Sequence, residues 1–338
     1  MSQVTVVGAG AIGGVIGAYL VRGGEDVLFV DIAEDHVAAI NARGLTVKGF
    51  DETFTVPAQA VTPDQMPARL DVVILAVKAP ATRTAMEQIA PRLAPEGYVV
   101  SAQNGLNEVI ISQMVGPERT IGCFVNFSAD YLEPGLIHYG GPGAFYIGEL
   151  DGSRSPRIQA LQRMLSHWHG GPVRITDNIW GYLWGKQAYG AMLFATALTN
   201  ETMADAISAY RDVMVALAQE VLAVAAAEGV APLGFDGFEP DVLITAGGAE
   251  LDASIERLVA VRRRDQKQRS GVWRDLAVRK RRTEVDEHFQ PILRLAEQHG
   301  LQTPILASMV QMIHEIEEGK RPLSTKNLDH LRRVMAEA

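Results

Sequence analysis

The first 31 residues constrain the fold of this 338-residue chain more than any other segment. An apolar, strand-like run is followed by a glycine-rich turn, small and apolar residues at helical spacing, and a second apolar run that ends in Asp31. Three glycines stand in the register G-x-G-x-x-G, where they serve a tight turn, close approach of backbone to a pyrophosphate, and close packing of helix on strand. The pattern predicts a dinucleotide site in which phosphates meet free N–H groups at a helix start formed by Gly8, Gly10, Ala11, Ile12 and Gly13.

Asp31 selects between the two nicotinamide dinucleotides. A carboxylate at the end of the second strand accepts hydrogen bonds from a ribose 2′-OH and repels a 2′-phosphate. Neither Ile32 nor Ala33 supplies a compensating positive charge. We therefore expect NAD(H) as the favoured cofactor, with NADP(H) possible; the alternative interpretation of Asp31 is a solvated acid at a strand end.

Strand and helix patterns continue to alternate through the first half of the chain. Lys78 and Asn104 lie just past the C-terminal ends of two predicted strands, at the rim where open α/β sheets bind ligands. The alternative interpretation is that Lys78 is a solvated lysine and Asn104 is a residue of a turn. The predicted strands cover 71–78, 97–105 and 120–129, a helix covers 81–93, residues 135–150 are short antiparallel strands around glycine turns, and 171–176 are an edge strand.

From Asp177 onward the apolar residues recur at the spacing of a helix. Two domains follow, as expected at roughly 100–200 residues per domain: a Rossmann-type α/β dinucleotide-binding domain at 1–176 and an all-α domain at 177–338 for substrate binding and dimerisation. The final twenty residues are either a short terminal helix or a tail. The predicted helices cover 178–199, 205–229, 251–269, 284–300 and 303–318.

Composition excludes several classes of partner. The net charge of -9 argues against a general nucleic-acid or anionic-membrane binder. A single cysteine, Cys123, excludes an intramolecular disulfide and fits a reducing compartment. The N-terminus shows no signal peptide, and His167 and His169 have no third ligand nearby, so we expect a cytoplasmic protein that holds no metal.

Lys186 carries the only charge between Trp180 and Leu198. Burying an ammonium without a partner is costly, so the position needs an explanation. Apolar surroundings lower the pKa of a lysine toward neutrality, which suits a general acid. A structural lysine that snorkels to the surface, or an ion-pair anchor, are the alternatives.

Glu284 is the acid that we expect to accompany this lysine. Thr283 is predicted to cap a helix, with Asp286 three residues on, so Glu284 falls in the first helical turn, where the helix dipole stabilises a negative charge. An acid fixed in this way orients a lysine or accepts a substrate hydroxyl. Simple capping of the first turn is the alternative.

Several short motifs occur in one order and together resemble the ketopantoate reductase (2-dehydropantoate 2-reductase) family. They are the opening glycine motif, "VKA" at 77–79, "QNG" at 103–105, "LWGK" at 183–186 and "TEVD" at 283–286. The resemblance implies a Rossmann domain joined to a helical domain, with hydride transfer between a nicotinamide and C2 of a 2-oxo acid. It also implies that Lys186 is the catalytic acid, Glu284 binds a substrate hydroxyl, Asn104 lies in the active site, and Lys78 contacts the cofactor.

The chain departs from this family at several polar positions. Asparagines that the family commonly carries four and eight residues after the lysine are Gly190 and Phe194 here, and a substrate-contacting serine falls near Gly271, with Ser270 beside it. The family is typically NADPH-linked and has a basic residue where this chain has Asp31. We therefore expect a 2-oxo acid other than ketopantoate, either larger or more apolar near Phe194.

The segment 262–282 holds ten Lys and Arg against two acids. It is a solvated helical face or, in the functional interpretation, a source of a guanidinium such as Arg274 that clamps the substrate carboxylate. We therefore expect an NAD(H)-dependent 2-oxo acid reductase or 2-hydroxy acid dehydrogenase that forms a homodimer. A genuine ketopantoate reductase and a non-catalytic NAD(H) sensor are the alternatives.

Overall fold

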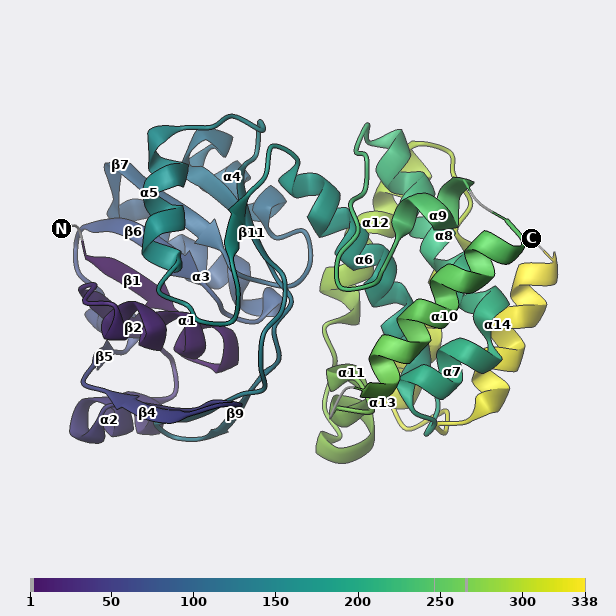
Figure 1. The fold of residues 1–338 in the computed structure, drawn as a ribbon, viewed down its shortest axis with the longest axis horizontal. Coiled ribbons are helices and arrows are strands. Elements are labelled where there is room, and N and C mark those ends of the chain that lie inside the picture. The colour runs from purple at the N-terminus through teal and green to yellow at the C-terminus, as the bar shows by residue number, and fades with distance from the viewer. Residues whose placement is uncertain (1–2, 246, 265–266, 338) are drawn as a thin grey trace. The chain divides into compact units, whose positions relative to one another are not determined.

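The computed structural model describes residues 3–245, 247–264 and 267–337. The chain divides after Ile179 into two compact units, of which the first is an α/β unit and the second is helical (Figure 1). The predicted fold class, a Rossmann-type unit followed by an all-α unit, is confirmed. Across the described residues, no helix has the length and apolar character needed to cross a bilayer.

An eight-stranded sheet forms the centre of the first unit. Its order is β12-β11-β8-β7-β6-β1-β2-β5, in which β11 runs antiparallel to β8 while every other neighbouring pair is parallel. The edge strand expected near 171–176 is β12. The strands are β1 (Val4–Val7), β2 (Val27–Val30), β5 (Gln59–Val61), β6 (Leu70–Leu75), β7 (Leu93–Ser101), β8 (Thr120–Val125), β11 (Phe145–Glu149) and β12 (Val173–Ile175).

The main sheet has an apolar core on each face, as side chains that alternate along a strand require. Along β6, Val72 and Ile74 join the core that holds α1 and α5, whereas Val73 and Leu75 join the core that holds α3 and α4. The predicted helix at 81–93 is shorter than expected, because 3₁₀ turns flank α3. The helices are α1 (Ala11–Arg22), α2 (Glu34–Arg43), α3 (Thr82–Ile89), α4 (Glu108–Val115) and α5 (Pro156–Leu165).

A second, four-stranded sheet with the order β4-β3-β10-β9 packs on α1. As expected, residues 135–150 form two short strands with antiparallel neighbours, β10 beside β9 and β11 beside β8. The two strands do not pair with each other: β10 also pairs with β3 in the second sheet, whereas β11 belongs to the main sheet. The glycine-rich link between β10 and β11 therefore passes from one sheet to the other. These strands are β3 (Leu45–Lys48), β4 (Thr53–Val56), β9 (Ala129–Glu133) and β10 (Leu136–Tyr139).

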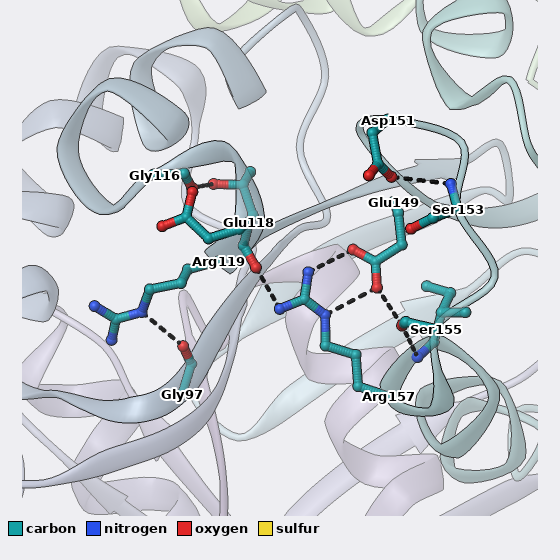
Figure 2. Close-up of polar contacts among 11 residues, drawn as sticks. Gly97, Gly116, Glu118, Arg119, Glu149, Asp151, Ser153, Ser155 and Arg157 are labelled. Carbon is teal, nitrogen blue, oxygen red and sulfur yellow. Dashed lines mark hydrogen bonds and ion pairs between the residues drawn. The ribbon is translucent and has the colours of Figure 1, made fainter.

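A buried carboxylate fastens α5 to the main sheet (Figure 2). Glu149, at the end of β11, is only 4% exposed, and its two oxygens accept hydrogen bonds from Arg157 Nε at 2.8 Å and Nη2 at 2.5 Å. Ser155 donates to the same carboxylate at 2.5 Å and caps α5 by accepting from the N–H of Ile158. The third Arg157 nitrogen donates to the carbonyl of Glu118, so one guanidinium joins three segments.

The second unit consists of helices around α8, which contacts α7, α9, α12, α13 and α14. Our helix predictions for 205–229 and 251–269 were too long: the first breaks at Tyr210, and α10 ends at Arg264, with residues 265–266 outside the described part. The last segment is a helix, not a tail. The helices are α6 (Ile179–Thr196), α7 (Met203–Ala209), α8 (Arg211–Ala227), α9 (Pro240–Thr245), α10 (Ala249–Arg264), α11 (Gly271–Arg274), α12 (Val285–Gln298), α13 (Pro304–Glu317) and α14 (Thr325–Glu337).

Candidate functional site

The glycine-rich turn between β1 and α1 has the geometry that a dinucleotide phosphate requires. Gly8 adopts a φ of +94°, and a Cβ there would lie 2.7 Å from the backbone nitrogen of Val77. A Cβ at Gly13 would lie 2.0 Å from the carbonyl oxygen of Gly8, so the turn is closed by direct backbone contact. At Gly10, the N-cap residue of α1, no described atom lies within 4 Å of the Cβ position.

The start of α1 is open to an anion. Within the described chain, this helix has no side-chain cap and no acid in its first turn. The first helical bond, from Gly14 N–H to Gly10 carbonyl at 2.7 Å, leaves the amides of Ala11, Ile12 and Gly13 as the free donors of the helix start. These donors and the empty face of Gly10 fit a pyrophosphate.

Asp31 lies beside this turn and is part of its scaffold. Its Oδ2 accepts from the N–H of Ala9 at 2.8 Å, and its Oδ1 accepts from the N–H of Ala33 at 3.0 Å. A carboxylate has about four lone-pair sites, so two backbone bonds leave capacity for a ribose hydroxyl. The neighbouring Ile32 side chain is 83% exposed and carries no charge to attract a 2′-phosphate.

His36 binds the other backbone polar group of Ala9, its carbonyl, and sequence reasoning missed this role. The ring is 1% exposed; its Nε2 donates to the carbonyl of Ala9 at 2.8 Å, and its Nδ1 accepts from the N–H of Gly135 at 2.9 Å. This pairing corresponds to the neutral tautomer with the proton on Nε2. No local pattern reveals this role, because Gly135 lies 99 residues away in the chain.

Lys78 and Asn104 follow neighbouring strands of the main sheet, β6 and β7, and both side chains are exposed. Their loops are joined by Gln103, whose Nε2 donates to the carbonyl of Val77 at 2.8 Å and to Thr82 Oγ1 at 2.7 Å. Asn107 completes the link by donating to the carbonyl of Asn104 at 2.6 Å and accepting from Thr82 at 3.0 Å. The structure thus brings both loops to the sheet edge where the glycine turn lies.

The remaining candidate residues belong to the second unit. Lys186 is half-buried on α6, where Gly185 lets the backbone of Leu233 approach: a Cβ at 185 would lie 2.3 Å from the Leu233 carbonyl oxygen. Glu284 is the N-cap residue of α12 and lies just before its first turn, not inside it as expected. Thr283, which we predicted as the N-cap, lies one residue before it. Its hydroxyl donates to Glu317 at 2.7 Å and accepts from the N–H of Val285 at 3.3 Å.

His288 is a second residue that the sequence reasoning missed. It lies one turn after Glu284 on α12, and its Nδ1 is 2.9 Å from Oε1 of the buried Gln187, which follows Lys186 on α6. Burial, with the charge of Lys186 as the second cause, lowers the pKa of His288 to about 3. The i, i+4 spacing from Glu284 is the signal that could have indicated it.

Ser270 and Arg274 bound the short helix α11. The Ser270 side chain caps this helix by accepting from the N–H of Trp273 at 3.1 Å, which occupies one acceptor site of its hydroxyl; the residue is 7% exposed. In the basic segment, Arg279 and Arg281 are bound by the buried Asp275 at 2.9 Å and 3.0 Å. Two arginines of the basic segment therefore hold together the turn that follows α11.

The positions where the chain departs from the ketopantoate reductase pattern are open or apolar. A Cβ at Gly190 or at Gly271 would meet no described atom within 4 Å. Phe194 is 4% exposed and packs its ring 5.2 Å from that of His288 and 5.0 Å from that of Phe289. The structure thus leaves room at Gly190 and an aromatic cluster one turn further along α6.

Comparison with known proteins gives matches along most of the chain. The family model described as ketopantoate reductase PanE/ApbA matches residues 4–152, and the model of its C-terminal part matches residues 178–317. A 2-dehydropantoate 2-reductase of Mesorhizobium japonicum is 34% identical over 226 residues, which are 60% of this chain and 68% of that relative.

Solved structures share the fold. A PanE/ApbA family ketopantoate reductase from Ralstonia eutropha JMP134 matches with a TM-score of 0.76 and 25% identity over 94% of this chain and 99% of the other. A D-mandelate dehydrogenase, solved with NADH and anilino(oxo)acetate, matches with a TM-score of 0.79 and 21% identity over the same shares of the two chains.

Proposed function

Because the chain belongs to the ketopantoate reductase family of oxidoreductases, we propose that it interconverts a 2-oxo acid and a 2-hydroxy acid, with NAD(H) as its favoured cofactor. The observation that carries this proposal is the open start of α1 at Gly10, next to the carboxylate of Asp31. That pair of features suits a dinucleotide without a 2′-phosphate.

The cofactor site is proposed to consist of the α1 start, Asp31, and the exposed Lys78 and Asn104 at the ends of β6 and β7. The helix amides hold the pyrophosphate, and Asp31 accepts from the ribose hydroxyls. The bound nicotinamide supplies or accepts the hydride at C2 of the substrate. Asn104 contacts both cofactor and substrate.

Lys186 and Glu284 are proposed to perform the acid–base chemistry. In the reduction, negative charge develops on the carbonyl oxygen, and the ammonium of Lys186 stabilises that charge and donates the proton. Glu284 accepts a hydrogen bond from a substrate hydroxyl. Ser270 and Arg274 are proposed to contact the substrate, Arg274 through its carboxylate.

His288 is a poor rival for the role of general acid. A group whose pKa is about 3 holds its proton in only a small fraction of molecules near pH 7, whereas a lysine keeps one available. This contrast supports Lys186 as the acid.

We also propose that the protein is cytoplasmic and forms a homodimer. Sedimentation or light scattering of the purified protein tests the oligomeric state.

Two alternative functions remain, and each has its own test. A genuine 2-dehydropantoate 2-reductase, the activity named for the Mesorhizobium japonicum relative, turns over ketopantoate with NADPH in preference to other oxo acids. A non-catalytic sensor binds NAD(H) and keeps its function when Lys186 is replaced. A panel of 2-oxo acids assayed with NADH and with NADPH separates the first alternative from our proposal.

Lys186→Met tests the proposed chemistry. We expect kcat to fall by about 10²–10⁴-fold, because proton transfer by a positioned group contributes that much. Binding of NADH, followed by fluorescence titration, is expected to stay within about twofold of wild type, since this lysine is assigned to the substrate. Lys320→Met, at an exposed lysine paired with Glu318, is the matched control. Turnover in Lys186→Met equal to that of Lys320→Met contradicts the proposal.

A further inference from the structure

Glu284 stands at a position of α12 that the helix alone does not fix. As the N-cap residue it accepts the first helical bond, from the N–H of His288 at 3.1 Å, but its own backbone angles, φ −96° and ψ 26°, are not those of a helix. The direction of its carboxylate therefore depends on what holds the residues on either side of it. Both flanks, at Thr283 and at Asp286, are bound by the last turn of α13.

Glu317, the last residue of α13, holds the residue before Glu284. Its Oε1 accepts from the backbone N–H of Thr283 at 2.7 Å and from the Thr283 hydroxyl at 2.7 Å. Because this hydroxyl gives its proton to the carboxylate, it keeps a lone pair with which it accepts from the N–H of Val285 at 3.3 Å. Hydrogen bonds thus run from Glu317 to the residue before Glu284 and, through it, to the residue after.

His314 holds the other side of this position. It lies three residues before Glu317 on α13, and its Nε2 is 2.9 Å from Oδ1 of Asp286, two residues after Glu284. Thr283 and Asp286 are likewise three residues apart, so the two contacts match in spacing along α12 and α13. Since the contact at Asp286 does not involve Glu317, we expect α12 to remain attached to α13 when Glu317 is replaced.

An acid at position 317 has an electrostatic cost. A carboxylate at the C-terminal end of a helix faces the negative end of the helix dipole. It also lies near other acids: burial, with the charges of Asp286, Glu284 and Glu317 as further causes, raises the pKa of Glu287. The two hydrogen bonds to Thr283 offset these costs, which points to a role for Glu317 beyond the stability of α13.

We propose that Glu317 is a positioning residue for Glu284: by holding Thr283, it fixes the direction in which the Glu284 carboxylate points. This inference rests on the proposed function, which assigns Glu284 to the substrate hydroxyl. A group that must meet one atom of a bound substrate works only in a narrow range of directions, and a misplacement of about 1 Å can cost about 10²-fold in rate. In this role Glu317 contacts Thr283 and not the substrate.

The test is a double-mutant cycle of Glu317→Leu and Glu284→Gln. NADH-linked kcat/KM is measured with pyruvate, phenylpyruvate and 2-dehydropantoate, and the acid that wild type turns over best is used for all four proteins. We expect Glu317→Leu to lower kcat/KM by about tenfold in the wild-type chain and by less than about twofold when Glu284 is already replaced. A residue with a structural role alone lowers kcat/KM equally in both backgrounds, and that outcome overturns the inference.

Two further variants separate the hydrogen bonds of Glu317 from its shape and charge. Glu317→Gln keeps one carbonyl oxygen, which can accept both bonds now made to Oε1, and is expected to restore kcat/KM to within about threefold of wild type. Glu318→Leu, at the neighbouring acid that pairs with Lys320, is the matched control and should leave kcat/KM unchanged. A value of kcat/KM in Glu317→Gln as low as that in Glu317→Leu contradicts a role through Thr283.

Thr283→Val makes the same comparison without changing α13, and it decides the inference if Glu317→Leu does not fold. It removes the hydroxyl that joins Glu317 to Val285 and keeps the N–H that binds Glu317. We expect kcat/KM to fall by about fivefold in the wild-type chain and by less than about twofold together with Glu284→Gln. Thr283→Ser, which keeps the hydroxyl, should recover most of the loss, and equal losses in both backgrounds overturn the inference.

These outcomes are distinct from a failure of the proposed function. Turnover of no 2-oxo acid by wild type, or full turnover in Lys186→Met, removes the function itself. Wild-type kcat/KM in Glu284→Gln removes the assignment of Glu284 and, with it, this inference. A loss in Glu284→Gln to which the loss from Glu317→Leu simply adds keeps the function and removes only the positioning role.

Discussion

At the scale of single residues, Ala9 is held through both of its backbone polar groups. Asp31 binds its N–H group and His36 binds its carbonyl, so the turn proposed to receive a phosphate is held from both sides. The Asp31 carboxylate therefore has two tasks: it supports the turn, and it is proposed to recognise the ribose.

Asp31→Ser tests the proposed cofactor preference. Removing the carboxylate removes repulsion of a 2′-phosphate, so we expect the ratio of kcat/KM with NADH to that with NADPH to fall by about tenfold or more. The ratio is the informative readout, since loss of the Ala9 hydrogen bond weakens binding of both cofactors alike. A wild-type ratio in the variant would assign Asp31 to scaffolding alone.

His288 makes the stability of the protein depend on pH. Its pKa in the folded state, about 3, lies below the ordinary value of 6.5, so the unfolded state binds the extra proton between these pH values. The free energy of unfolding should therefore fall as pH decreases from about 6.5 toward 4. In His288→Gln the slope of the free energy of unfolding against pH, measured by urea denaturation, is expected to decrease by up to the amount that corresponds to about one bound proton. An unchanged slope in His288→Gln would contradict this assignment.

At the scale of elements, strong local periodicity predicted most of what positions the site. The spacing of apolar residues predicts the strand–turn–helix unit at the N-terminus and the helix that carries Lys186. It also predicts the two strands that precede Lys78 and Asn104. The second sheet did not, because β3, β4, β9 and β10 are short and partly exposed. In this sheet, the pairing of β10 with β3 joins residues about ninety positions apart in the chain.

The candidate site divides in the same way. The glycine turn has a signature because steric limits on backbone geometry demand glycine at fixed spacing. His36 and Gln187 have none, since their roles depend on partners that only the folded chain brings near. His288 stands between these cases, with a spacing signal from Glu284 and a Gln187 partner 101 residues away in the chain.

The Glu149–Arg157 pair is the element-scale feature with the clearest energetic consequence. Arg157→Ala leaves the buried Glu149 carboxylate without its two guanidinium hydrogen bonds and frees the carbonyl of Glu118. Because the arginine side chain is itself 29% exposed, we expect a loss of about 2–3 kcal/mol in the free energy of unfolding, below the range for fully buried pairs.

The matched control for this loss is Arg69→Ala, at a side chain that is 70% exposed and paired with Asp71. Exposed pairs contribute less than about 1 kcal/mol. Urea denaturation of the two variants provides the comparison, and equal losses would contradict the assignment of Arg157 as the anchor of α5.

At the scale of the whole molecule, cofactor recognition and the proposed proton donor belong to different units. The residues proposed to bind NAD(H) lie before Ile179, and Lys186 and Glu284 lie after it. Ligand binding stabilises the unit that binds it, by about 2.7 kcal/mol at a ligand concentration one hundred times the Kd.

We therefore expect NADH to raise the melting temperature of wild type and of Lys186→Met to the same extent, as measured by differential scanning calorimetry. Asp31→Ser should show a smaller shift at the same NADH concentration, because both the ribose contact and the turn are weakened. A shift that disappears in Lys186→Met would mean that the second unit contributes to cofactor binding directly.

The double use of Asp31 also limits how this enzyme can evolve or be redesigned. A chain that acquires an arginine at position 31 to attract NADPH gains a charge suited to the new cofactor and, in the same step, loses the tether of its phosphate turn. An exchange of coenzyme that also keeps the turn intact therefore requires a compensating change elsewhere in the loop.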